Sequence, residues 1–139
     1  LLFEKIFIIC SKAFYKDIKP IKEKLEENNW EVFLPHTYEN PNAEYEWYAK
    51  GKEEHARIKG ELFRKSRERI KSMDAVLTLN FDKNGKKNYI GGSTFLELYE
   101  AFMEGKDIYL WNEVPEGILF DEINGFAPKI INGNLELVK

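Results

Sequence analysis

The feature that most constrains this chain is a regular alternation between short apolar runs and longer amphipathic segments. The run at residues 5–10, Lys-Ile-Phe-Ile-Ile-Cys, is apolar and β-branched on both of its faces. A strand has this pattern when helices cover both sides of its sheet. Further strands are expected at residues 30–34, 74–80, 107–111 and 129–131, and helices at 18–28, 53–72, 94–104 and 118–123. This alternation predicts a three-layer α/β fold with a mainly parallel, five-stranded sheet.

Composition narrows the class of protein. The 139 residues are enough for one domain, residues 1–139, with a core of its own. The net charge of -3 lacks the basic surplus of a protein that binds nucleic-acid polymers. The longest apolar run is too short to span a bilayer, and the N-terminal residues lack the basic region of a secretory signal, so no membrane association is expected.

The few cysteines and histidines also limit the chemistry. The single cysteine, Cys10, excludes an internal disulfide and suits a reducing compartment, so a cytoplasmic location is expected. Two histidines and one cysteine give no ligand set with zinc spacing. We therefore expect neither a metal nor a cofactor.

Candidate binding residues follow the expected strands. Ligands of open α/β sheets bind beyond the carboxyl ends of the strands. The residues expected there are Ser11, Lys12, His36, Asn80, Asp82 and Asn112. The loop Gly91-Gly92-Ser93-Thr94 reaches the same edge and opens the helix at 94–104. Glycines let the backbone approach a ligand, and the first amides of a helix lack intrahelical partners. This loop therefore predicts a site for an anion or a sugar hydroxyl.

Several of these residues have two interpretations. Thr94 and Glu97 have the spacing of a capping box, whereas Glu97 can equally be a nucleophile or a sugar-binding carboxylate at the crevice. His36 is either a general acid or an ordinary loop histidine. Ser66, on the apolar stripe of the helix at 53–72, either binds a ligand or permits close helix packing. The aromatic segment at 37–51 either stacks on a nucleobase or forms a lid or a dimer contact.

Three stretches carry a resemblance to a known family: Asp74-Ala75-Val76-Leu77-Thr78-Leu79, Glu97-Leu98-Tyr99-Glu100-Ala101-Phe102, and Gly105-Lys106. With the glycine loop, they resemble the nucleoside 2-deoxyribosyltransferase superfamily, which includes deoxynucleoside 5′-monophosphate N-glycosidases. The resemblance is best over residues 62–110. It implies a Rossmann-like or flavodoxin-like fold and a homodimer that binds a nucleoside or nucleotide. It also implies that Glu97 is a nucleophile at the sugar carbon, in deoxyribosyl transfer or hydrolysis.

The chain departs from the family pattern at three positions. Ser66 and Gly91 stand where the family has acidic residues, and Tyr99 replaces a glycine beside the matching glutamate. Asp82 follows an expected strand directly and is the candidate for the missing second acid. Without such an acid the leaving base has no proton donor. A non-catalytic nucleotide-binding or sensing domain is therefore the alternative function.

Overall fold

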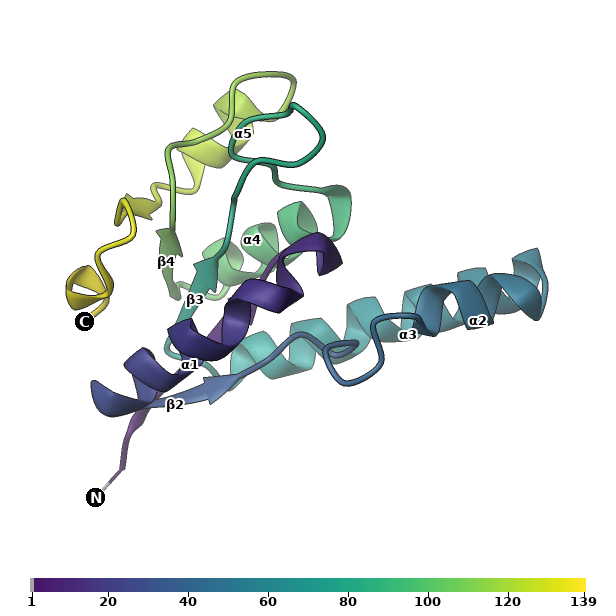
Figure 1. The fold of residues 1–139 in the computed structure, drawn as a ribbon, viewed down its shortest axis with the longest axis horizontal. Helices are drawn as coiled ribbons and strands as arrows, with labels where there is room; N and C mark the ends of the chain where they lie inside the picture. Colours follow the sequence, from purple (N-terminus) through teal and green to yellow (C-terminus); the bar gives the residue numbers. More distant parts are fainter. Residues whose placement is uncertain (1) are drawn as a thin grey trace.

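The computed structural model describes residues 2–139, and in this part of the chain five strands form one sheet (Figure 1). The strands are β1 (Glu4–Ile9), β2 (Trp30–Phe33), β3 (Ala75–Thr78), β4 (Asp107–Leu110) and β5 (Lys129–Ile130). All neighbouring strands pair in parallel, in the order β2-β1-β3-β4-β5. This is the strand order of flavodoxin-like folds. The predicted α/β fold with a five-stranded parallel sheet is therefore confirmed.

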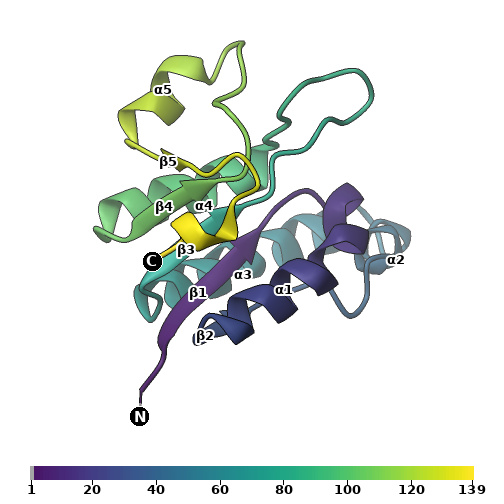
Figure 2. The same cartoon turned by 60° about the vertical axis from the view of Figure 1, so that its left-hand side comes forward.

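Helices cover both faces of the sheet (Figure 2). The helical elements are η1 (Lys12–Asp17), α1 (Ile18–Glu27), α2 (Ala43–Ala49), α3 (Lys52–Lys71), α4 (Gly92–Met103), α5 (Phe120–Gly125) and η2 (Leu135–Leu137). Buried side chains of α1 pack on one face, and buried side chains of α3, α4 and α5 pack on the other. The chain therefore forms three layers.

The first strand explains why the sheet is covered on both sides. Ile6 and Ile8 belong to the core beneath α1, whereas Phe7 and Ile9 belong to the core beneath α3 and α4. All four side chains are at most 1% exposed. Successive side chains of a strand point to opposite faces, so an unbroken apolar run fills two cores at once.

The segment at 37–51, whose structure the sequence left open, contains the short helix α2. It lies along the first turns of α3, and this part of α3 projects with α2 beyond the sheet (Figure 1). His55 on α3 stacks on the ring of Tyr48, with centroids 3.8 Å apart. These contacts fix α2 beside one end of the sheet, where β1 and β2 finish.

The start of α4 differs from the capping-box hypothesis. The helix begins at Gly92, two residues before the expected position, and its N-cap residue Gly91 makes no side-chain capping bond. Thr94 is the third residue of the helix and is buried, while Glu97 lies in the second turn. The pair therefore does not cap the helix, and Glu97 is free for another role.

Within residues 2–139 the structure contains no helix that is both long and apolar enough to cross a bilayer.

Candidate functional site

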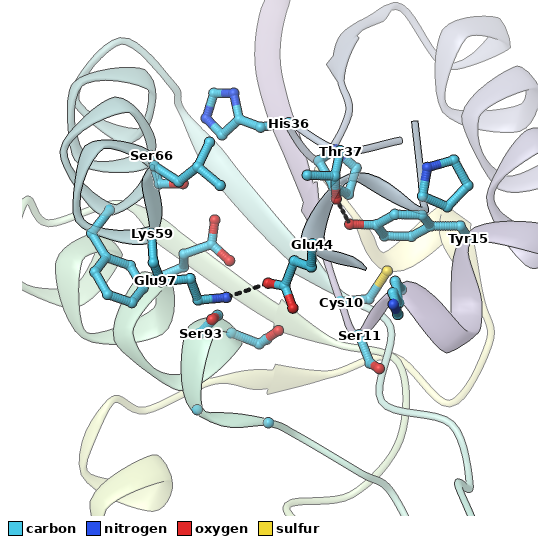
Figure 3. A pocket seen from close by; sticks show the side chains of 18 of the residues that line it. Cys10, Ser11, Tyr15, His36, Thr37, Glu44, Lys59, Ser66, Ser93 and Glu97 are labelled. Atoms are coloured by element: carbon cyan, nitrogen blue, oxygen red, sulfur yellow. Dashed lines mark hydrogen bonds and ion pairs between the residues drawn. The ribbon is translucent and has the colours of Figure 1, made fainter. Parts of the chain in front are cut away.

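A cavity of about 320 Å³ lies beside the carboxyl ends of β1 and β2, between α2, α3 and the start of α4 (Figure 3). Its walls come from segments that are distant in the sequence. The lining residues are Cys10, Ser11, Lys12, Tyr15, Pro35, His36, Thr37, Pro41, Glu44, Lys59, Leu62, Phe63, Ser66, Lys83, Tyr89, Gly91, Gly92, Ser93, Thr94 and Glu97. Because the strand order reverses between β1 and β3, a crevice is expected at this edge of the sheet.

Glu97 provides the carboxylate on the α4 side of this pocket. Burial raises its pKa from an ordinary value of 4.5 to about 7. The Ser66 hydroxyl, from the neighbouring helix α3, and the more distant positive charges of Lys59 and Arg69 oppose the rise. Near neutral pH this carboxyl can therefore either donate or accept a hydrogen bond.

The first turn of α4 forms the adjoining wall. Gly91, Gly92, Ser93 and Thr94 all line the pocket. The first amides of a helix have no intrahelical acceptor, and here, among residues 2–139, no N-cap side chain is bonded to them. Together with the positive end of the helix dipole, these amides suit a negatively charged group.

Lys83 adds a positive charge to the same wall. Its Nζ donates to the Ser11 hydroxyl at 3.2 Å, which joins the loop after β3 to the loop after β1. Its ammonium also lies 4.7 Å from the centre of the Tyr89 ring. Lys83 is therefore held at the cavity beside the amides of α4.

Two further lysines reach the pocket from other directions. Lys59 on α3 donates to a carboxylate oxygen of Glu44 on α2 at 2.6 Å, which ties the two helices together at the cavity. Lys12 lies over the ring of Tyr45, with its Nζ 4.1 Å from the ring centre. The pocket thus gathers three ammonium groups around one paired carboxylate, Glu44, and one carboxyl with a raised pKa, Glu97.

His36 lies at the wall that follows β2. Its ring meets Phe7 edge-on, with centroids 6.1 Å apart, and its Nε2 is buried with no hydrogen-bond partner among residues 2–139. Burial, reinforced by the positive charges of Arg69 and Lys65, lowers the His36 pKa to about 4. The histidine is therefore neutral at physiological pH, which does not suit the hypothesis of a general acid.

Tyr15 and Cys10 complete the wall near β1. The Tyr15 hydroxyl and the Thr37 hydroxyl are 2.8 Å apart and hydrogen-bonded. Burial raises the pKa of Tyr15 to about 12 and that of the Cys10 thiol to about 12. Neither group ionises near neutral pH, so both present neutral atoms to the cavity.

Most of the sequence-predicted binding residues come together here. Ser11, Lys12, His36, Ser66, Gly91, Gly92, Ser93, Thr94 and Glu97 all line this one cavity. Ser66 is buried on α3 and also lines the pocket, so its position is compatible with either of its two interpretations.

Three predicted residues lie elsewhere. The Asn80 amide is buried and donates to the backbone carbonyls of Asn112 and Glu113, at 3.0 Å each. The Asn112 side-chain amide in turn donates a hydrogen bond to the backbone carbonyl of Asn80 at 3.1 Å. This pair joins the loops after β3 and β4. Asp82 accepts from the Asn88 backbone N–H at 3.0 Å and closes its own loop. Asp82 is therefore not an acid partner of Glu97 in this structure.

The sequence reasoning did not select Lys59, Glu44 or Tyr15 as site residues. A signal for Lys59 was available, because it falls seven residues before Ser66, on the same stripe of α3. Glu44 and Tyr15 had no comparable signal. Their positions depend on how α2 and η1 pack near the sheet. Within the described residues, no group of three or more His, Cys, Asp or Glu side chains could hold a metal.

Comparisons with known proteins bear on the family. No protein-family model matches this sequence, and no curated protein matches it. Among solved structures, the chain is similar to FerB, a flavoenzyme NAD(P)H:(acceptor) oxidoreductase from Paracoccus denitrificans. The identity is 16% and the TM-score is 0.44, over 97% of this chain and 71% of that one.

These findings correct the expected family and activity. The resemblance to the nucleoside 2-deoxyribosyltransferase superfamily is contradicted, since no family model matches this sequence. Deoxyribosyl transfer and N-glycosidic hydrolysis are contradicted with it, and so is Glu97 as a nucleophile at a sugar carbon. The short motif is not specific to one family, because a glycine loop before a helix occurs in many α/β folds of different function. What stands is the fold class and the geometry of the pocket.

Proposed function

We propose that this pocket binds a small phosphorylated molecule of mononucleotide size. The observation that carries the proposal is that the uncapped first turn of α4 and the Lys83 ammonium line the same cavity. Backbone amides and a lysine are the usual ligands of a phosphate group in α/β folds. The cavity volume is at the lower end of the range for small-molecule sites, which favours one nucleotide unit over two.

The remaining walls suit the rest of such a ligand. Phe63, Tyr15 and His36 give flat, uncharged surfaces on which an aromatic ring can pack. Glu97, with its raised pKa, can donate to a ligand carbonyl or accept from a ligand hydroxyl. The proposal is therefore a binding function in which α4 holds the phosphate and Glu97 forms a hydrogen bond with a polar group of the ligand. A cytoplasmic location is part of this proposal, and the single cysteine, Cys10, which suits a reducing compartment, supports it.

Calorimetry and thermal unfolding with matched ligands test the proposal. The panel contains inorganic phosphate, ribose 5-phosphate, nucleoside monophosphates with their nucleosides, and flavin mononucleotide with riboflavin. A phosphorylated member is expected to bind about tenfold or more tightly than its dephosphorylated counterpart, because the phosphate gains charge-assisted hydrogen bonds. Its binding raises the unfolding temperature by mass action. Flavins also report binding directly through their visible absorbance.

Two lysine variants distinguish the pocket from general surface charge. Lys83→Ala is expected to weaken the phosphorylated ligand, whereas Lys87→Ala is the matched control because Lys87 is on the same loop but does not line this cavity. Equal losses in both variants would mean that loop charge alone attracts the anion. Absence of binding across the whole panel at millimolar concentration would overturn the proposal.

A further inference from the structure

An apolar surface runs along the outer side of α4, on the opposite side of the helix from Glu97. Leu96, Tyr99, Phe102 and Met103 are 44%, 46%, 45% and 61% exposed. At helical spacing these positions form one continuous strip, because residues three and four apart are neighbours on a helix surface. The strip, which we call the α4 face, takes no part in the pocket.

The α4 face is continuous with an aromatic cluster beside α5. The ring of Phe126 lies 5.5 Å from that of Phe102 and 6.4 Å from that of Tyr99, measured between centroids. Phe126 also contacts Phe95, at 5.7 Å. These contacts hold the edge of the face in place, so the exposed aromatic side chains are supported by a packed base.

The size of the α4 face matches what a modest dimer needs. Four large side chains that are about half exposed present roughly 400 Å² of apolar surface. Homodimer interfaces are about 65% apolar, so this area corresponds to roughly 600 Å² buried on each partner. The total reaches the lower limit of standard protein interfaces, about 1,200 Å².

The charges on either side of the α4 face are of opposite sign. In the helical layer, α4 lies between α3 and α5 (Figure 2). On the α3 side, Arg67 pairs with Glu100 of α4 at 3.4 Å, which leaves the exposed Arg64 as the basic residue; the first turn of α5 carries Asp121 and Glu122. A two-fold axis parallel to α4 would set the basic edge of one copy against the acidic edge of the other. The surface is therefore complementary to itself.

We propose that the α4 face is the interface between two copies of this chain, related by a two-fold axis that runs along α4. Such an interface is isologous, because each copy uses the same residues. Leu96 and Met103 meet their counterparts near the axis, and the edges of α3 and α5 pair at the rim. The proposal is independent of the ligand, since the pocket lies on the other side of α4.

Sedimentation across micromolar to millimolar concentrations tests the interface. The wild-type chain is expected to associate reversibly to a dimer. Leu96→Glu and Met103→Glu should each raise the dissociation constant by about tenfold or more, because they place unpaired charges in an apolar contact. Ile118→Glu is the matched control, since Ile118 is 94% exposed but lies outside the α4 face. Circular dichroism and unfolding confirm that each variant folds.

Charge exchange tests the direction of the axis. Arg64→Glu and Asp121→Lys, made separately, should each weaken the dimer, and the double variant should restore most of the loss. A chain that stays monomeric at millimolar concentration would overturn the proposal, as would a dimer that neither glutamate variant weakens. Failure of the double variant to restore association would reject the arrangement with the axis along α4.

Discussion

Glu97 on α4 and Ser66 on α3 meet at one wall of the pocket, where the serine hydroxyl opposes the effect of burial on the glutamate pKa. The two residues are 31 positions apart in the sequence and come together because α3 and α4 pack side by side on the sheet. Burial dominates, so the pKa of Glu97 remains near 7. This places the ionisation of one pocket residue in the physiological pH range.

The first prediction concerns the pH dependence of stability at Glu97. Between its unfolded value of 4.5 and its folded value of about 7, the folded state holds a proton that the unfolded state has released. The contribution of Glu97 to the free energy of unfolding therefore falls as pH rises through this window. Glu97→Gln should remove that fall, which urea unfolding at several pH values between 4 and 8 would reveal. An unchanged pH profile in the variant would mean that the carboxyl is solvated.

A second prediction has the opposite sign. His36 has a pKa lowered from 6.5 to about 4, so between these values the unfolded state binds the extra proton. Its contribution to stability rises with pH over this window and is complete above 6.5. In wild type, the rising contribution of His36 partly offsets the falling contribution of Glu97. His36→Gln removes this offset, so the free energy of unfolding should fall more steeply with rising pH. The same urea series measures this, and a flatter profile would contradict it.

Gly92→Pro gives a third prediction, specific to the phosphate wall. Gly92 is the first residue of α4, where proline is tolerated, and Gly91 before it already has extended backbone angles. The substitution removes one N–H donor from the pocket without breaking the helix. We expect phosphate-dependent binding to weaken by about tenfold while stability changes little, because one charge-assisted bond is lost. Gly92→Ala, whose added methyl group has open space, is the control that keeps the N–H.

The fourth prediction is that Cys10 is unreactive in the folded protein. Burial raises its pKa from 9.0 to about 12, and the negative charges of Glu97 and Asp17 add to the effect. Because the thiolate is the reactive form, labelling by a disulfide reagent at pH 8 should be roughly 100-fold or more slower than in urea. Equal rates in the two states would show that the thiol ionises freely.

A fifth prediction separates Asn80 from the pocket. Its side chain makes two donor bonds and accepts the Asn112 backbone N–H at 2.8 Å, all in a fully buried position. Asn80→Ala should lower the free energy of unfolding by about 2 kcal/mol or more, because several buried partners lose their bonds. Ligand affinity should stay unchanged when measured at a temperature where the variant is folded. A loss of affinity without a loss of stability would place Asn80 in the site.

Some of the candidate site was predictable because parallel strands end at one edge of the sheet. Ser11, Lys12 and His36 follow β1 and β2, and the structure brings them to the cavity as expected. The same rule places Asn80 and Asn112 at this edge, but neither residue lines the cavity. Their amides bond to each other's loops, a choice that depends on distances between β3 and β4 that local sequence does not contain.

The sequence by itself determined the layers of this protein. An apolar run such as Phe7 and its neighbours can be buried only with cover on both faces, and that requirement leads to a parallel sheet between helices. Tertiary structure alone decided the chemistry of the pocket. Lys59 meets Glu44, and Ser66 meets Glu97, only once the helices have packed. Periodicity reports which side of an element is buried, whereas the pairing of charges and the pKa of a carboxyl depend on neighbours from distant parts of the chain.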